Sequence, residues 1–589
     1  MTDVGGDLDP GGMVGIVGID QRAIDVEDCC RHDEHDSRDS NHHCSGRIDS
    51  FHHGSSNRSS TLGMRSRIMS RLTRRQFIGR TALIAGTLPM FAWDEACQRA
   101  NVTTSTLQSF RNSLDGTVVF PIDDHYWDYT VVWNARFKHA PMMFVFPKNA
   151  QDVAKAIQFS RDHGIRLSPR GGGHNYCGWS TCDGMVIDFR DMSDVALTSD
   201  ASKVHVGPGA LLFDVYQKLW CEGQCSLPMG TCPTVGLAGF TLGGGFGLYS
   251  RAWGLMCDRL IEVEAVTADG EVITANHHNQ HHDLFRACRG GGGGSLCVVT
   301  KFVYEPIPLD VATLGRVILS NFDAAEEFID IYQNFGPNAD HDLGVVMSIG
   351  TRPGNQNGAR CGMAAVVIGD EDKWHTLMDP FLNELQSQNV PHSSTAPQAS
   401  NPAQIAITYA RRGTDPQWQA CDSDVPDARH FEKSGPCKPS SVYLNEPLTS
   451  NGLETFAGAI RTRQEDTSFT NSASISMDCY GGQIAQEPEG GSVMYHRTAM
   501  AVSQLFTGGW DSDAPASYVK KNIDWINDTR HALVKVATNG AYVNYCDDAI
   551  EDWETAYWGD QYPFLQTVKH TYDPNDVFRF PQSIRLPGA

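Results

Sequence analysis

From about Phe120 the chain alternates short apolar runs with amphipathic stretches. The run FVF predicts a short buried strand. A helix is predicted to open between Pro147 and Ala150, since the apolar residues that follow recur at near-helical spacing. Gly164 is predicted to end this helix, and IRLSPR to form a second strand that runs into a glycine loop. The order strand, helix, strand indicates a crossover unit.

The pattern changes character after Pro308. Before it, MVIDFR, KVHVGPG, IEVEAVTADGEVI and CVVTKFVYEPIP predict strands, with turn signals for two hairpins, and GALLFDVYQKLWCEG predicts a helix. After it, strands alternate with longer helices such as AAEEFIDIYQNF and KWHTLMDPFLNELQSQ, so we expect a domain boundary near residue 309. Turn-rich, polar residues 398–439 predict loops over a site. We therefore expect an α+β fold.

Length and charge narrow the possible partners. A chain of 589 residues exceeds one ordinary core, which predicts two large domains. The formal net charge of −23 argues against nucleic acid, because phosphate binding needs a basic surface, and it disfavours adsorption to anionic lipid. We expect a monomer that meets neutral or cationic small molecules.

The first hundred residues differ from the rest. Residues 1–63 are rich in His, Asp and Ser without zinc-site spacing, and we interpret them as disordered or as non-native sequence upstream of a start at Met64 or Met69. Residues 64–100 contain Arg74, Arg75 and a short apolar run, which resemble a twin-arginine export signal. An ordinary basic helix start is the alternative. An export signal implies a secreted or periplasmic protein that the twin-arginine machinery carries folded.

Three glycine-dense loops dominate the first predicted domain: RGGGHNYCGWS, GTCPTVGLAGFTLGGGFG and RACRGGGGGSLC. Glycine in such numbers indicates positive φ angles or a close approach by another group. Backbone N–H groups in such turns suit an anion such as a diphosphate. Neither the phosphate-binding G-x-x-x-x-G-K-[ST] motif nor a dinucleotide G-x-G-x-x-G motif is satisfied. Tight turns alone are the alternative.

Two of these loops carry a nucleophile. His174 follows three glycines, which would let a planar ring approach it, although most histidines are structural or on the surface. Cys232 precedes Pro233, which keeps its backbone extended. Thirteen of the 17 cysteines follow residue 100. In an exported protein this odd number would leave at least one sulfur without a disulfide partner, and we expect Cys232 to be that one. The alternative is that several of the other cysteines are simply reduced and buried. Both nucleophiles are candidates for covalent links to one cofactor.

The three loops, followed by YVNYCD and YWGDQYPFLQTVKHTYDPNDVFRFPQSI, resemble the berberine-bridge-enzyme-like flavoproteins of the vanillyl-alcohol-oxidase type. SMDCYGGQIAQ and MYHR match more loosely. The resemblance implies a PCMH-type FAD-binding domain of two α+β subdomains at 120–308, an α+β substrate domain with an antiparallel sheet at 309–540, and a C-terminal segment, 541–589, that completes the FAD domain. The chain departs from the family pattern at Cys177 and at SLC, which replaces Asn-Phe-Gly after the third glycine run.

The resemblance also implies site residues. FAD would be bicovalent, with His174 on its 8α carbon and Cys232 on its 6 carbon, as in the subgroup similar to glucooligosaccharide oxidase, and no metal is expected. The further residues expected to bind the cofactor are Arg170, Gly171, Gly172, Gly173, Asn175, Gly178, Gly230, Thr231, Thr234, Val235, Gly236, Gly239, Gly243, Gly244, Gly245, Gly247, Val298 and Asn544.

Tyr542 or Tyr545 is expected to be the catalytic base. If YVNY is a strand, Tyr542 and Asn544 share one face and Tyr545 lies on the other. We expect an oxidase that takes hydride from an alcohol or carbohydrate, with O2 as the acceptor and H2O2 as the product. The alternatives are an oxidative tailoring enzyme for an amine, alkaloid or other secondary metabolite, a catalytically inactive flavin-binding protein, and a disulfide-rich structural protein.

Overall fold

The predicted crossover unit forms a four-stranded sheet in the order β1–β2–β4–β3. In this computed structural model, which describes residues 97, 100–228, 230–354, 358–410, 421 and 435–588, β2 and β3 both pair in parallel with β4. Parallel pairing needs a crossover connection, and α5 supplies one from an N-cap in which Asn149 accepts a hydrogen bond from Asp152 N. The bounds are α4 (Thr104–Ser113), β1 (Thr117–Val119), β2 (Met143–Phe146), α5 (Ala150–Asp162), β3 (Leu167–Arg170) and β4 (Met185–Asp188).

A second, five-stranded sheet is antiparallel throughout, in the order β5–β6–β10–β8–β9. Its β8–β9 pair confirms a predicted hairpin, with Gly270 at φ +82° in the turn. The bounds are β5 (Val195–Leu197), β6 (Val204–Val206), α6 (Leu212–Gly223), β7 (Cys225–Ser226), α7 (Leu237–Leu242), α8 (Ser250–Trp253), β8 (Leu260–Val266), β9 (Val272–Ala275), α9 (His282–Ala287), β10 (Val298–Tyr304) and β11 (Ile307–Pro308), of which β7 and β11 pair separately.

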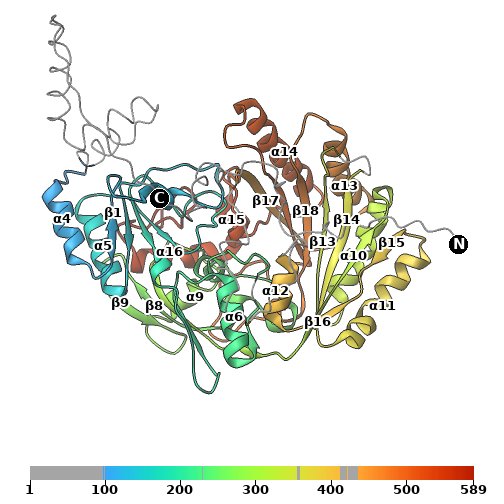
Figure 1. The fold of residues 1–589 in the computed structure, drawn as a ribbon, viewed down its shortest axis with the longest axis horizontal. Coiled ribbons are helices and arrows are strands. Elements are labelled where there is room, and N and C mark those ends of the chain that lie inside the picture. Colours follow the sequence, from blue (N-terminus) through green and yellow to red (C-terminus); the bar gives the residue numbers. More distant parts are fainter. Residues whose placement is uncertain are drawn as a thin grey trace, which may run out of the picture. The chain divides into compact units, whose positions relative to one another are not determined.

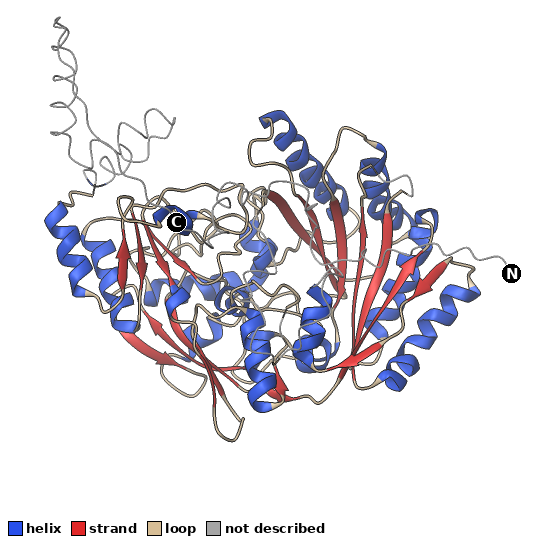
Figure 2. Cartoon of the chain, viewed as in Figure 1, coloured by secondary structure: helices blue, strands red, loops and turns tan. Residues whose placement is uncertain are grey.

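The third large sheet is antiparallel and has eight strands. Its order is β15–β12–β14–β13–β18–β19–β17, with β16 also paired to β12. The helices α10, α11, α13 and α14 pack on one face (Figures 1 and 2), where apolar side chains form a continuous core. The bounds are β12 (Ala312–Leu319), α10 (Ala325–Phe335), β13 (Leu343–Gly350), β14 (Arg360–Ile368), α11 (Glu371–Ser387), β15 (His392–Ser394), β16 (Gln398–Ser400), α12 (Pro402–Ala410), β17 (Cys437–Leu444), α13 (Ser450–Glu465), β18 (Ala473–Cys479), β19 (Ala501–Gly508) and α14 (Ala516–Val534).

The prediction of loops over 398–439 is wrong for much of its described part. Residues 398–400 are β16, residues 402–410 are α12, and β17 begins at Cys437. The helix buries Ile405 and Ile407 and packs against α6 and β12. Its own sequence, PAQIAITYA, is apolar, but the polar composition of its neighbours hid it. Residues 411–420 and 422–434 lie outside the described part of the chain.

The C-terminal segment packs on the first half of the chain. It contains a 3₁₀ turn, η8 (Val543–Tyr545), and the helices α15 (Trp553–Trp558) and α16 (Tyr562–Tyr572). Trp558 Nε1 donates to Gly290 O at 3.0 Å, and the fully buried Lys569 donates to Ser295 O at 2.9 Å. YVNY is not a strand, because Tyr545 N donates to Tyr542 O and closes a tight turn. The domain boundaries at 309 and 541 stay predictions, since residues 95–589 pack as one compact unit.

The described cysteines follow the alternative left open by the sequence, in which several besides Cys232 are reduced and buried. One disulfide joins Cys221 to Cys421, and the other described cysteines are thiols. All of these thiols are buried except that of Cys232, so exposure rather than parity distinguishes it.

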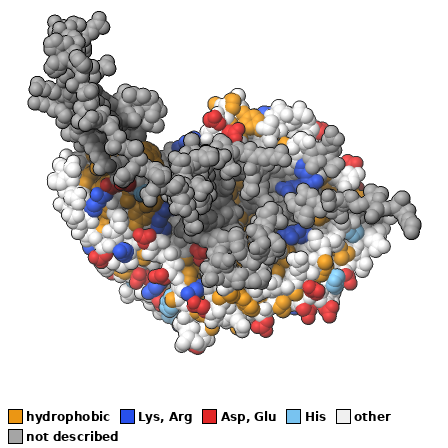
Figure 3. Space-filling view, viewed as in Figure 1, with side chains coloured by type: hydrophobic (Ala, Val, Ile, Leu, Met, Phe, Trp, Pro, Cys, Tyr) orange, Lys and Arg blue, Asp and Glu red, His pale blue; other side chains and the backbone are white. Residues whose placement is uncertain are grey.

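The described residues show neither a membrane-spanning helix nor, on the face drawn in Figure 3, a segregation of charge. No helix among the described residues is both long and apolar enough to cross a membrane. On the face drawn in Figure 3, acidic and basic side chains are interspersed. The export signal and the residues before it lie almost wholly outside the described residues, so both stay predictions.

Candidate active site

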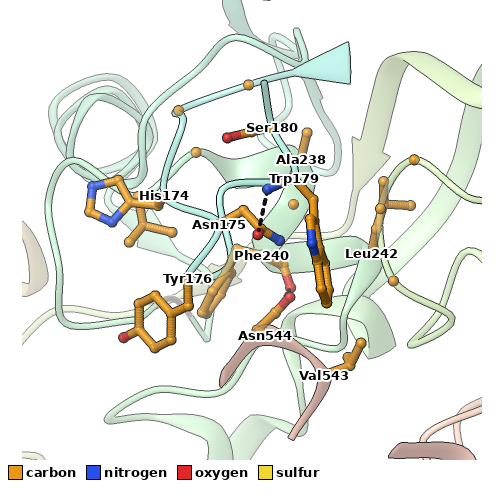
Figure 4. Close-up of a pocket in the computed structure, with 18 of the residues that line it drawn as sticks. His174, Asn175, Tyr176, Trp179, Ser180, Ala238, Phe240, Leu242, Val543 and Asn544 are labelled. Atoms are coloured by element: carbon orange, nitrogen blue, oxygen red, sulfur yellow. Dashed lines mark hydrogen bonds between the residues drawn. The ribbon is translucent and has the colours of Figure 1, made fainter. Parts of the chain in front are cut away.

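A large cavity lies where the glycine loops, the C-terminal segment and the eight-stranded sheet meet. Figure 4 shows the residues that the loops and the C-terminal segment contribute to it. The sheet contributes Val346 from β13 and Asp478 from β18. Sixteen of the residues expected from the sequence line it: Gly171, Gly172, Gly173, His174, Asn175, Gly230, Thr231, Cys232, Val235, Gly236, Gly239, Gly247, Val298, Tyr542, Asn544 and Tyr545.

The first two glycine loops touch each other along their backbones. A Cβ atom on Gly172 would lie 2.3 Å from Gly236 N, and one on Gly236 would lie 2.2 Å from Gly172 N. Only glycine permits this approach. Across the same contact, His174 Nε2 and Thr234 Oγ1 are 2.7 Å apart. The two loops that carry the candidate nucleophiles therefore form one wall of the cavity.

His174 and Cys232 differ in their surroundings. Burial lowers the pKa of His174 to about 3, so its imidazole is neutral near pH 7. Its ring stacks on Trp133, with the ring centroids 4.9 Å apart. Cys232 is partly exposed and lies close enough to Tyr545 for the two groups to interact electrostatically. A neutral imidazole and an accessible thiol are both competent nucleophiles.

One stretch of the cavity wall offers unpaired polar groups. The backbone N–H groups of Gly171, Gly172 and Gly173 have no acceptor among the described residues, and neither do those of Gly293 and Gly294. The buried Oγ of Ser180, which Figure 4 labels beside this loop, also lacks a partner in the described chain. A Cβ on Gly239 would meet no atom within 4 Å. Such a wall suits a large anionic ligand.

The two candidate tyrosines have different partners. Tyr542 is fully buried, and its oxygen accepts hydrogen bonds from Gly245 N and from Asn544 Nδ2, both at 2.9 Å. The hydroxyl of Tyr545 has no hydrogen-bond partner in the described part of the chain, and its ring stacks on Tyr176 at 5.6 Å. Burial raises the pKa of both hydroxyls, and the charge of Asp478 raises that of Tyr545 further. Tyr545 is the tyrosine whose hydroxyl remains available to a ligand.

Asp478 was not predicted from the sequence. Burial raises the pKa of its carboxyl to about 7, against a weaker opposing hydrogen bond from Ser476 Oγ at 3.4 Å. It projects from β18 into the cavity and lies close enough to act on Tyr545 and on Tyr409 of α12. A carboxyl that titrates near neutral pH beside an unpaired phenol is suited to proton transfer.

Comparison with known proteins agrees with this geometry. Residues 141–276 match the family described as FAD binding domain, and residues 541–585 match the family described as berberine and berberine like. The FAD-linked oxidoreductase YgaK of Bacillus subtilis is 30% identical over 481 residues, which cover 80% of this chain and 98% of that protein. The chain belongs to the berberine-like FAD-linked oxidoreductases.

Relatives of this FAD-linked oxidoreductase include enzymes with named substrates. The chitooligosaccharide oxidase of Gibberella zeae is 27% identical over 466 residues, 77% of this chain and 89% of that protein. Among solved structures, BBE-like 1 of Physcomitrella patens superposes with a TM-score of 0.72 at 27% identity, covering 82% of this chain and 100% of that one. The predicted fold class and family are confirmed.

The cavity of the FAD-linked oxidoreductase fits FAD. The unpaired N–H groups of the first and third glycine loops suit its diphosphate. The open space beside Gly239 leaves room for the rest of the FAD molecule, and the Ser180 hydroxyl, which has no partner among the described residues, can hydrogen-bond to it. Trp179 and Phe580, stacked 5.0 Å apart, supply an aromatic wall.

Six of the expected cofactor residues lie behind the cavity instead of lining it: Arg170, Gly178, Thr234, Gly243, Gly244 and Gly245. Arg170 pairs with Asp188, with both side chains buried. Gly243 lets Asn544 approach, because a Cβ there would lie 2.1 Å from Asn544 Oδ1. These residues shape the loops.

Sequence reasoning missed several lining residues besides Asp478: Trp179, Ser180, Phe189, Pro208, Phe240, Val346, Gly293, Gly294, Trp558, Phe580 and Gln582. A signal existed for Asp478. In SASISMDC, polar residues alternate with apolar ones, which is typical of a strand with one face open to a cavity. The others come from distant segments and carry no local signal.

Proposed function

We propose that this FAD-linked oxidoreductase is an oxidase that removes hydride from the hydroxyl-bearing carbon of an alcohol or carbohydrate. The observation that carries the proposal is the convergence of Cys232, Tyr545 and Asp478 at one end of the cavity. FAD, when bound, supplies the hydride acceptor and passes the electrons to O2, with H2O2 as the product.

We propose further that His174 and Cys232 both link covalently to FAD. The neutral imidazole of His174 supports this role, as does the accessibility of the Cys232 thiol. The two residues lie on separate loops that meet at Gly172 and Gly236, so one planar ring could reach both. A doubly linked cofactor needs little enclosure, which would leave the site open to bulky substrates.

In this proposal Tyr545 takes the proton of the substrate hydroxyl. Its own hydroxyl is unpaired among the described residues, whereas the oxygen of Tyr542 already accepts two hydrogen bonds. Asp478 assists as the ionised neighbour that receives the proton from Tyr545 through a bridging water, because the two side chains interact by charge without a direct hydrogen bond among the described residues. The pKa of Asp478, about 7, matches this task near neutral pH.

The face of β18 beside Asp478 supports a hydroxylated substrate. Ser474, Ser476 and Asp478 alternate with buried apolar residues and are partly exposed on the same face. They form a polar row that extends from the cavity at about 7 Å per step. Its chemistry suits sugar hydroxyls, and a relative is named chitooligosaccharide oxidase.

Amine oxidation is a second candidate. The carboxylate of Asp478 at the cavity would attract an ammonium group, and a relative that is 25% identical over 479 residues is named tetrahydroberberine oxidase of Argemone mexicana.

We also propose that Arg74 and Arg75 direct export through the twin-arginine route, since folding around FAD before export would suit a flavoprotein. A fusion of residues 64–100 to a reporter should be exported, and the same fusion with both arginines replaced by lysine should remain inside. Export of the lysine variant would contradict the proposal.

Peroxide release tests the proposed activity. The FAD-loaded protein would be offered chito- and glucooligosaccharides, simple alcohols and benzylisoquinoline amines in air. We expect peroxide from at least one hydroxylated compound, and none from Tyr545→Phe with the same compound. Turnover of amines alone would favour the second candidate. If no compound bleached the flavin, both candidates would be contradicted.

A further inference from the structure

Four of the buried cysteines lie in two pairs whose thiols contact each other. Cys177 contacts Cys546, and Cys288 contacts Cys297. All four are nearly inaccessible to solvent and belong to the same apolar core. Both places where the sequence departs from the flavoprotein pattern, Cys177 and the SLC that ends at Cys297, are thus occupied by a paired thiol.

The first pair joins two separate segments of the cavity wall. Asn175 Oδ1 accepts a hydrogen bond from Cys177 N at 3.0 Å and lies 3.7 Å from Cys546 Sγ. The two cysteines therefore meet around one amide group. Cys177 follows the His174 loop, and Cys546 follows Tyr545, so a bond between them would fix these two candidate residues relative to each other.

The second pair encloses the third glycine loop. Cys288 caps the end of α9, and its N–H donates to Leu284 O at 2.8 Å. Cys297 directly precedes β10 and lines the cavity. Between them Gly290, Gly292 and Gly294 have positive φ angles, so this loop is intrinsically permissive. A bond between its ends would restrict it in the unfolded chain as well as in the folded one.

We propose that Cys177–Cys546 and Cys288–Cys297 are disulfide sites, and that both bonds form when the chain matures under oxidising conditions. Each bond forms by thiol–disulfide exchange with a small-molecule disulfide such as oxidised glutathione. A thiolate attacks one sulfur of the reagent and expels one reduced thiol, and the second cysteine then displaces the other. Two protein thiols become one disulfide, and one oxidised reagent becomes two reduced thiols.

Burial gives this proposal a kinetic signature. Burial, helped by the partner thiol, raises the pKa of Cys177 well above the usual thiol value, and the partner thiol, helped by burial, does the same for Cys288. Thiolate is therefore scarce at both in the folded protein. The bonds should form during folding, or slowly by opening of the finished protein, and once formed they should resist reduction while the protein stays folded.

Peptide mapping without reductant tests the proposal. The full chain, with FAD, is produced in an oxidising compartment and, in parallel, equilibrated with oxidised glutathione at a mildly destabilising temperature. Both samples are denatured with an alkylating agent and digested. We expect three cross-linked peptide pairs, Cys177–Cys546, Cys288–Cys297 and Cys221–Cys421, with Cys182 and Cys361 alkylated. Alkylation of Cys177, Cys288, Cys297 and Cys546 in both samples would overturn the proposal.

Thermal unfolding supplies a second readout. Cys546→Ser should lower the Tm of the oxidised protein by several degrees and leave almost unchanged that of protein produced in a reducing compartment and kept in dithiothreitol. Cys182→Ser is the matched control, because Cys182 is buried but donates only to backbone oxygens of Arg166 and Met185. An equal Tm loss for Cys546→Ser in both redox states would assign Cys546 a packing role and contradict the disulfide. Neither readout depends on catalytic activity, so failure here is separate from failure of the proposed oxidase.

Discussion

Replacing Asp478 with asparagine should lower activity and raise stability together. The carboxyl lines the FAD cavity and acts electrostatically on Tyr545, and the substitution removes the group that we propose receives the proton. General-base assistance contributes roughly 10²–10⁴-fold, so kcat/KM at about pH 8 should fall by about 100-fold or more. Loss of activity alone would not distinguish a catalytic role from damage to the fold. A simultaneous gain in stability would exclude damage to the fold.

The sign of the stability change follows from the pKa. Burial raises the carboxyl pKa of Asp478 from 3.8 to about 7, so the folded state favours the neutral acid. Ionised Asp478 therefore opposes folding, with a penalty that is absent below about pH 4, grows as the pH rises and is complete above about pH 7. A shift of about three pKa units corresponds to about 4 kcal/mol, an upper bound because the residue is partly exposed at the cavity wall. Asparagine removes this penalty.

Two measurements check the prediction. Initial rates between about pH 5 and pH 9 should show an acid limb near pH 7 in the parent, with a tenfold loss per pH unit below it, and no such limb in Asp478→Asn. Urea unfolding should show the variant more stable at about pH 8 and equal to the parent at about pH 4. Ser474→Ala, on the same face of β18, should keep the limb. The reasoning would be refuted if Asp478→Asn kept the acid limb, or if this variant were less stable than the parent at about pH 8.

The remaining predictions concern single contacts. Tyr545→Phe should lower kcat by about 100-fold or more with little change in Tm. Tyr542→Phe should lower the free energy of unfolding in urea by about 1–3 kcal/mol, because Gly245 N and Asn544 Nδ2 lose their acceptor. The opposite pattern would exchange the roles of the two tyrosines. Gly243→Ala should lower the FAD absorbance per protein, since its Cβ would lie 2.1 Å from Asn544 Oδ1, and full FAD content would contradict this. Lys569→Met should destabilise the protein by about 3–5 kcal/mol, measured by its urea midpoint, because it leaves a buried carboxylate without its partner; a neutral effect would contradict the importance of that pair.

Sequence patterns predicted those parts of the fold that depend on interactions between residues close together in the chain. The apolar spacing after Asn149 predicted α5, and the glycine-dense runs predicted loops that approach another group closely, as Gly172 and Gly236 do. The resemblance of the loops and of the C-terminal motif then predicted the family. These features depend on residues close together in the sequence.

Long-range contacts decided what the sequence left open or misplaced. The sequence did not choose between Tyr542 and Tyr545, but a tight turn gives the oxygen of Tyr542 two donors and that of Tyr545 none among the described residues. Asp478 became a candidate only because the eight-stranded sheet meets the glycine loops. Parity alone did not single out Cys232, because most of the described cysteines are thiols buried in the core.

The intact mass of the denatured protein tests the central claim most directly. After expression with ample riboflavin, the parent, Cys232→Ala, His174→Ala and the double variant would be unfolded, freed of loose cofactor and weighed. The account predicts one covalent FAD in the parent and in each single variant, and none in the double variant. A parent protein that weighs only its polypeptide and loses its yellow colour on unfolding would contradict it.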